Sequence, residues 1–203
     1  MSILSKSDAA AIKLYVEAGV LCSVEPHLID QTDGAIVVTC ADGDRSYDIF
    51  MHHAEMQRLH RSDPRIHWIS RNGGALRLSP DSPLNKPGHS TQIDCLDDIG
   101  EAIMLKGMKV IVLYGHAPCG KAGHHGLSLH ETLRLLISAK RVVLEHFPGL
   151  VARCFYHVDF GPDYEALGRR KQQLTYFLSR ETWESNVERI MREHADLLQF
   201  VER

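Results

Sequence analysis

Residues 109–121, KVIVLYGHAPCGK, contain the strongest indication of the fold. Residues 110–114 are apolar and rich in β-branched side chains, which is typical of a buried strand, and the glycine, proline and polar residues that follow indicate where this strand ends. Similar patterns occur at residues 35–40 (AIVVTC), 65–70 (RIHWIS) and 153–159 (RCFYHVD). We therefore predict four strands, of which residues 109–114 are the clearest.

Helical patterns lie before, between and after these strands. We expect helices at residues 8–21, 47–60, 91–106, 128–147 and 179–200. The helix at 128–147 is well marked, because Ser128 and Glu131 form a capping-box pattern and Pro148 and Gly149 end the helix. Strands that alternate with helices predict an α/β fold, with a mostly parallel central sheet flanked by helices on both faces.

The composition is that of one globular domain. The chain has 203 residues, 44% of them hydrophobic and 24% charged, which is enough to bury a core. The formal net charge is −3, so the chain lacks the excess of basic residues that is typical of a nucleic-acid-binding protein. It also contains no run of about 18 apolar residues, so we predict no membrane span. Five cysteines are an odd and sparse number, and residues 1–13 lack the apolar segment of a signal peptide, so we predict a cytoplasmic protein.

Two polar clusters directly follow predicted strands. They are residues 40–45 (CADGDR) and residues 115–121 (GHAPCGK). The carboxyl ends of parallel strands meet at one edge of a sheet, so Cys40, His116 and Cys119 can come together there. Two thiolates and one imidazole suit Zn²⁺, and three protein ligands leave the open position of a catalytic site. The alternative is that these cysteines are small buried hydrophobic residues.

A second interpretation of residues 115–121 is a P-loop, whose pattern is G-x-x-x-x-G-K. Asp159, at the end of another predicted strand, would then be the acidic residue that helps to hold Mg²⁺. However, Ala122 stands where a P-loop has the Ser or Thr that binds Mg²⁺. The P-loop interpretation also leaves Cys40 and Asp42 without a role.

The two clusters together resemble the motifs of the β-class carbonic anhydrases, in which Cys-x-Asp follows one strand and Gly-His-x-x-Cys-Gly follows a later one. Residues 71–74 (RNGG) and 156–161 (YHVDFG) also resemble segments of that family, so the similarity covers residues 35–161. The resemblance implies Zn²⁺ bound by Cys40, His116 and Cys119. It also implies a lyase that hydrates carbon dioxide reversibly to bicarbonate by a zinc-bound hydroxide, with Asp42 orienting the hydroxide and an arginine holding Asp42.

The sequence departs from the family at this arginine. The family pattern is C-x-D-x-R, but residue 44 is Asp and the arginine is Arg45. We expect the turn to bulge so that Arg45 still meets Asp42. In two alternatives, Asp44 pairs with Arg45 and faces the metal, or Arg71 replaces Arg45. The same site would also suit a hydrolase of carbonyl sulfide or carbon disulfide, or a zinc-binding relative without catalysis.

The resemblance further implies a homodimer or higher homo-oligomer, joined through the N-terminal helix, with a small molecule as its substrate. From the charge and the apolar runs we expect neither nucleic acid nor membrane as a partner. We divide the single domain into an N-terminal helical arm (residues 1–30), a zinc-site core (31–161) and C-terminal helices (162–203). His124 and His125 are candidate proton shuttles because they follow the second cluster, and His52 and His53 follow the first. The polar loop at residues 79–89 is either a lid or a disordered insert.

Overall fold

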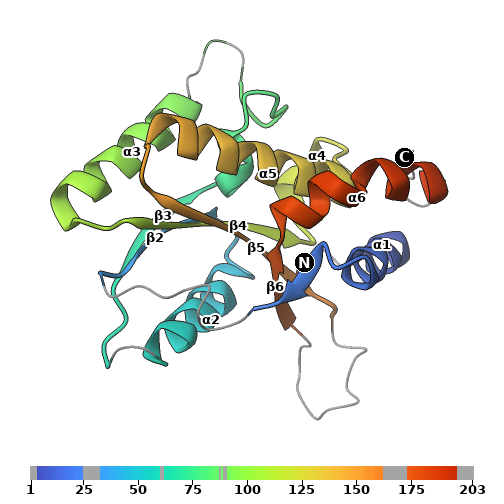
Figure 1. Ribbon diagram of the computed structural model, residues 1–203, viewed down its shortest axis with the longest axis horizontal. Coiled ribbons are helices and arrows are strands. Elements are labelled where there is room, and N and C mark those ends of the chain that lie inside the picture. Colours follow the sequence, from blue (N-terminus) through green and yellow to red (C-terminus); the bar gives the residue numbers. More distant parts are fainter. Residues whose placement is uncertain are drawn as a thin grey trace.

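The computed structural model describes residues 4–24, 33–59, 62–86, 88, 91–161 and 173–195. Its centre is a sheet with the strand order β1-β6-β5-β4-β2-β3 (Figure 1). The strands are β1 (Leu21–Ser23), β2 (Ala35–Cys40), β3 (Ile66–Arg71), β4 (Val110–Ala117), β5 (Val151–Asp159) and β6 (Gln173–Leu178). Strands β2 to β5 pair in parallel, whereas β6 is antiparallel to β5 and β1 is antiparallel to β6. The predicted α/β fold with a mostly parallel sheet is therefore confirmed.

Helices cover both faces of this sheet. They are α1 (Lys6–Glu17), α2 (Ser46–Arg58), the 3₁₀ helix η2 (Gly74–Leu78), α3 (Thr91–Lys106), α4 (Gly120–His124), α5 (Leu129–His146) and α6 (Arg180–Glu193). Figure 1 shows α2 on one face, α3 and α5 on the other, and α1 beside α6. No helix within the described ranges is long and apolar enough to cross a membrane.

The local signals at the helix ends explain the boundaries. Ser128 caps α5, because its hydroxyl accepts from the backbone N–H of Glu131 and the Glu131 carboxylate accepts from the backbone N–H of Ser128. The hydroxyl of Ser179 caps α6 in the same way by accepting from the N–H of Thr182. Helix α3 has the predicted bounds and is followed by Gly107 with a φ of 67°.

Two predictions at the chain's ends were wrong. The segment expected to hold only C-terminal helices includes β6, which pairs with β5 in the centre of the sheet and with β1 at its edge. The N-terminal helix was expected to reach Leu21, but α1 ends at Glu17 and Leu21 begins β1. Both strands depend on long-range pairing, which local propensity does not determine. Residues 25–30 of the predicted arm, and residues 196–200 of the last predicted helix, lie outside the described residues.

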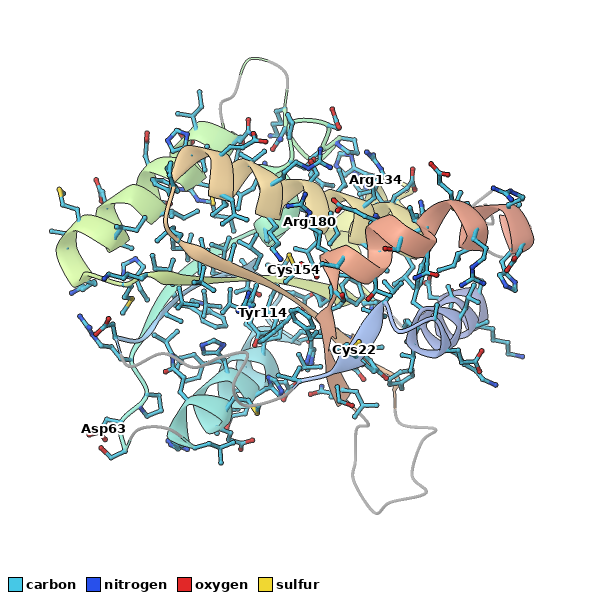
Figure 2. The ribbon with its side chains drawn as sticks, in the orientation of Figure 1. Cys22, Asp63, Tyr114, Arg134, Cys154 and Arg180 are labelled. Atoms are coloured by element: carbon cyan, nitrogen blue, oxygen red, sulfur yellow. The ribbon has the colours of Figure 1, made fainter. Side chains whose placement is uncertain are left out.

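Alternating side chains of the strands form two cores, one on each face of the sheet. Ile111, Leu113 and Cys154 belong to the larger core, which α1, α3, α5 and α6 cover. Tyr114 and Phe155 belong to the smaller core, which α2 covers. Figure 2 shows Cys154 on the side of α5 and Tyr114 on the side of α2. A sheet buried on both faces explains why its central strands are continuous apolar runs.

The polar loop predicted at residues 79–89 is packed in its described part, residues 79–86 and 88. Leu84 is buried in the larger core, and Ser79 is also buried. The Asn85 side-chain amide donates to the carbonyl oxygens of Arg77 and Ser79, and the Ser79 hydroxyl donates to that of Ser138 on α5. Neither a lid nor a disordered insert describes this part of the loop. His89 lies outside the described residues.

Candidate metal centre

Three side chains predicted as zinc ligands converge at the carboxyl edge of the sheet. Cys40 is the last residue of β2, His116 lies near the end of β4, and Cys119 directly precedes α4. Their ligand atoms, two Sγ atoms and one imidazole nitrogen, all lie within 4.8 Å of one another. Within the described residues this is the only such group of three or more His, Cys, Asp or Glu side chains. Cys40 and His116 are buried, and Cys119 is partly buried.

The tautomer of His116 is suited to a metal. Its Nδ1 lies 3.1 Å from the carbonyl oxygen of Pro118, which can only accept a hydrogen bond, so the proton is on Nδ1. The lone pair is therefore on Nε2, which is buried and has no hydrogen-bond partner in the described structure. A buried polar nitrogen without a partner is costly, and a backbone carbonyl that holds the other nitrogen is the usual arrangement of a metal-binding imidazole. His116 thus has the orientation that a zinc ligand requires.

The two cysteines of the site, Cys40 and Cys119, differ in the pKa of their thiols. The hydrogen bond from Cys40 lowers the pKa of Cys119 to about 4, and the backbone N–H of Ala122 acts in the same direction. The same hydrogen bond, together with burial, raises the pKa of Cys40. Cys119 is therefore the thiolate of the metal-free pair, and Cys40 keeps its proton until a cation replaces it. The backbone N–H of Gly73, 3.2 Å from Sγ of Cys40, is placed to donate to the Cys40 thiolate once it forms.

The turn at residues 71–74 packs against the backbone of Cys40. Gly74 has a φ of 48°, and a Cβ atom there would lie 2.4 Å from the backbone nitrogen of Cys40. A residue with a side chain does not fit at this position, so glycine allows β2 and this turn to approach closely. The RNGG segment therefore helps to place the Cys40 ligand.

Arg71, at the start of this turn, is not part of the site. Its guanidinium forms ion pairs with Asp98 and, at 3.8 Å, with Asp94 on α3. The alternative in which Arg71 replaces Arg45 is therefore wrong, because Arg71 is paired with two carboxylates of α3.

Arg45 is almost fully buried and lies among three carboxylates. Its Nη1 is 4.0 Å from Oδ1 of Asp42 and 3.2 Å from Oδ2 of Asp44, and its Nη2 is 3.1 Å from Oδ2 of Asp159. Arg45 therefore still meets Asp42, at the outer limit of an ion pair. The side chain of Asp44 is 53% exposed. The pairing of Asp44 with Arg45 expected in the first of the two alternatives is therefore present, but neither Asp44 nor Asp42 belongs to the metal-ligand group of the described residues.

The extra residue between Asp42 and Arg45 is accommodated by a tight turn. The Asp42 carbonyl accepts from the backbone N–H groups of Arg45 and Ser46 at 3.1 and 2.8 Å. Oδ1 of Asp42 accepts from the N–H of Asp44 at 3.0 Å, which closes an Asx-turn. The Ser46 hydroxyl donates to the same Asp42 carbonyl. These bonds fix the Asp42 carboxylate, which is 18% exposed, two residues beyond the Cys40 ligand.

The motif patterns gave Asp159 no role beside Arg45, although Asp159 ends the strand next to β4 at the carboxyl edge of the sheet. That position could have identified Asp159 as a site residue from the sequence, because functional groups gather where parallel strands end. Because Asp159 forms an ion pair with buried Arg45, its carboxylate is engaged and does not serve the Mg²⁺-binding role that the P-loop interpretation gives it. The structure therefore disfavours the P-loop interpretation.

A cavity of about 340 Å³ lies beside His116 and Cys119. Its wall includes Leu127, Leu129 and the hydrogen-bonded pair of Thr132 and Tyr156, whose oxygens are 2.9 Å apart. Burial raises the pKa of Tyr156, so this phenol stays neutral. The cavity therefore combines apolar surface with the neutral hydroxyls of Thr132 and Tyr156, and Asp8 is the acidic residue in its wall. Its size and largely apolar lining suit a small molecule.

The candidate shuttle histidines lie away from this cavity. His124 and His125 are exposed at the end of α4, and neither is part of the cavity wall. His53 is a buried residue of α2, with its Nδ1 3.3 Å from the hydroxyl of Tyr114, and His52 lines a separate cavity of about 260 Å³. None of these four side chains is placed by the structure beside the three ligand atoms.

Comparisons with known proteins find similarity only among solved structures. No protein-family model matches the sequence, and no curated relative is found. The β-carbonic anhydrase CafD of Aspergillus fumigatus is 10% identical, with a TM-score of 0.39 over 78% of this chain and 99% of that one. A carbonic anhydrase of Streptococcus mutans is 13% identical, with a TM-score of 0.37 over 85% and 99%. The β-carbonic anhydrase CafA of A. fumigatus is 15% identical, with a TM-score of 0.36 over 91% and 94%.

Proposed function

We propose that this protein binds one zinc ion through Cys40, His116 and Cys119 and catalyses the reversible hydration of carbon dioxide to bicarbonate. The observation that carries the proposal is the convergence of two sulfurs and one buried imidazole nitrogen that has no other partner in the described structure. Soft thiolates with imidazole favour Zn²⁺ over Mg²⁺ or Ca²⁺, which take oxygen ligands. Three protein ligands leave one position of a tetrahedron for a water molecule.

A zinc ion in this site would supply the Lewis acidity that makes water a nucleophile near neutral pH. Asp42 supports this function because its carboxylate is fixed by the N–H of Asp44 and lies close to the Cys40 ligand. From there it can accept a hydrogen bond from the attacking water and orient a lone pair of that water toward the substrate carbon. Arg45 places a positive charge beside this carboxylate, with its Nη1 4.0 Å from Oδ1 of Asp42.

The cavity beside His116 and Cys119 supports carbon dioxide as the substrate. Leu127 and Leu129 provide apolar surface for a molecule without charge or net dipole. The hydroxyls of Thr132 and Tyr156 bond each other at 2.9 Å, which reduces their competition for the reacting water. We therefore assign this cavity to substrate binding.

The test is zinc content and carbon dioxide hydration, measured on one preparation by metal analysis and stopped-flow spectroscopy. We expect about one zinc per chain and a rate above the buffer background between about pH 7 and pH 9, where the zinc-activated water is ionised. Cys119→Ala should lose both zinc and rate, whereas Cys22→Ala, a matched change at another partly buried cysteine, should lose neither.

The same preparation separates the alternatives. Zinc without hydration, together with hydrolysis of carbonyl sulfide or carbon disulfide, would assign the site to that reaction. Zinc without either activity would identify a zinc-binding protein without catalysis. Absence of zinc from protein refolded with the metal would contradict the proposal as a whole.

We propose a homodimer in the cytoplasm as the working form. In the structure of the single chain, α1 packs on its own α5 and α6, where the Tyr15 hydroxyl lies 2.6 Å from Nδ1 of His130 and the Tyr15 ring stacks on Trp183. Light scattering of the eluted protein, with and without residues 1–18, tests whether α1 is also needed for association.

A further inference from the structure

The guanidinium of Arg45 connects two strand ends across the sheet edge. One terminal nitrogen, Nη1, faces Asp42 and Asp44 in the turn after β2. The other, Nη2, faces Asp159 at the end of β5. The side chain of Arg45 is 2% exposed, so its charge is removed from water and requires a counter-charge that is equally buried.

Of the three carboxylates, only Asp159 meets that requirement. Its side chain is 2% exposed, against 18% for Asp42 and 53% for Asp44. An ion pair between buried groups is not weakened by water or salt as an exposed one is. Asp159 is therefore the strongest anchor for the guanidinium.

The Asp159 carboxylate is itself oriented by the backbone. The N–H of Gly161, whose φ is 84°, donates to Oδ1 at 2.9 Å. This bond leaves Oδ2 directed at Arg45. The turn after β5 thus presents one carboxylate oxygen to the guanidinium before any substrate arrives.

We propose that Asp159 is a positioning residue, which anchors Arg45 so that an arginine displaced by one position still reaches Asp42. This inference rests on the proposed function, because it assigns Asp159 to the orientation of Asp42 during hydration. The physical reason is that Asp42 and Asp44 compete for Nη1 of Arg45. Asp44 is closer to Nη1, at 3.2 Å against 4.0 Å for Asp42, and its side chain is more exposed to solvent. The ion pair between Asp159 and Nη2 holds the guanidinium inside the site, within reach of Asp42.

The experiment compares Asp159→Asn with Asp98→Asn, a matched control that makes the same chemical change in an Arg–Asp pair outside the site. Each variant is measured for zinc content and for kcat and KM of carbon dioxide hydration. Asp159→Asn should keep its zinc and lower kcat by about 10- to 100-fold, as is typical for loss of an outer-shell partner, with less than about a twofold change in KM. Asp98→Asn should change neither.

A cycle with Arg45→Gln tests whether Asp159 acts through Arg45. If it does, adding Asp159→Asn to Arg45→Gln lowers kcat no further. A full second loss of kcat in the double variant would overturn the proposal. So would an unchanged kcat in folded, zinc-loaded Asp159→Asn, or a larger loss in Asp44→Asn than in Asp159→Asn.

A second measurement does not depend on catalysis, and its first comparison uses the unmodified protein. A guanidinium anchored between buried carboxylates gives resolved NMR signals whose N–H protons exchange slowly with water. We expect such signals for Arg45 in the unmodified protein, and exchange as fast as that of surface arginines would overturn the proposal. If the unmodified protein binds zinc but does not hydrate carbon dioxide, the proposed function fails. Faster exchange in Asp159→Asn, but not in Asp98→Asn, would then still establish Asp159 as the anchor.

Discussion

Three histidines with buried ring nitrogens make the stability of this protein sensitive to mild acid. They are His52 and His53 on α2 and His157 on β5. Burial lowers the pKa of His52 from 6.5 to about 4, and it lowers those of His53 and His157 to about 3. Each ring has one buried nitrogen without a hydrogen-bond partner in the described structure, so protonation would bury an unpaired positive charge.

The sign of the effect follows from proton binding. Below pH 6.5, the value for the exposed imidazole, the unfolded chain binds protons that the folded chain does not, so the free energy of unfolding falls as the pH falls. At about pH 5 each of the three histidines lowers the free energy of unfolding by about 2 kcal/mol, since one pKa unit corresponds to about 1.4 kcal/mol. Together they remove about 6 kcal/mol, a large part of the stability of a domain. Above about pH 7 the contribution is absent.

The perturbation that tests this reasoning is His53→Gln, which keeps a polar group near the Tyr114 hydroxyl but does not titrate. Urea unfolding is followed by tryptophan fluorescence at about pH 7.5 and about pH 5, with both proteins in the same metal state, and the loss between the two pH values should be about 2 kcal/mol smaller in the variant. The exposed His124→Gln is the control and should leave the loss unchanged. An equal loss in His53→Gln and in the unmodified protein would refute the argument.

Further predictions concern the metal centre. Asp42→Asn should keep its zinc but lower kcat by about 10- to 100-fold in the stopped-flow assay, and an equal rate would show that Asp42 is misassigned. Gly74→Ala should lower both zinc content and the urea midpoint, because its Cβ would lie 2.4 Å from the Cys40 nitrogen. Gly149→Ala, which has a positive φ but open space, should cost only about 1 kcal/mol and keep its zinc. Chelation should lower Tm reversibly, since free zinc at about 100 times its Kd adds about 2.7 kcal/mol of stability; an unchanged Tm would argue against a bound metal.

The residue patterns of the chain determined the parts of the fold and site that depend on short stretches. The apolar run at residues 35–40 predicts β2, and the capping box at Ser128 predicts the start of α5, because burial pattern and capping act within a few residues. The ligand set was also predictable. Cys40 and His116 lie at the carboxyl ends of strands of one parallel sheet, with Cys119 just beyond, so they had to come together at the same edge.

Only the tertiary structure decided which charges pair. Arg45 and Arg71 face five carboxylates between them, and no local rule assigns one to another. Arg71 pairs with Asp98 because α3 packs near β3, and Arg45, buried in the turn after β2, pairs with Asp159 at the end of β5. Which arginine pairs with which carboxylate depends on which charged groups are buried together. That burial is decided only when helices and strands far apart in the sequence pack against each other.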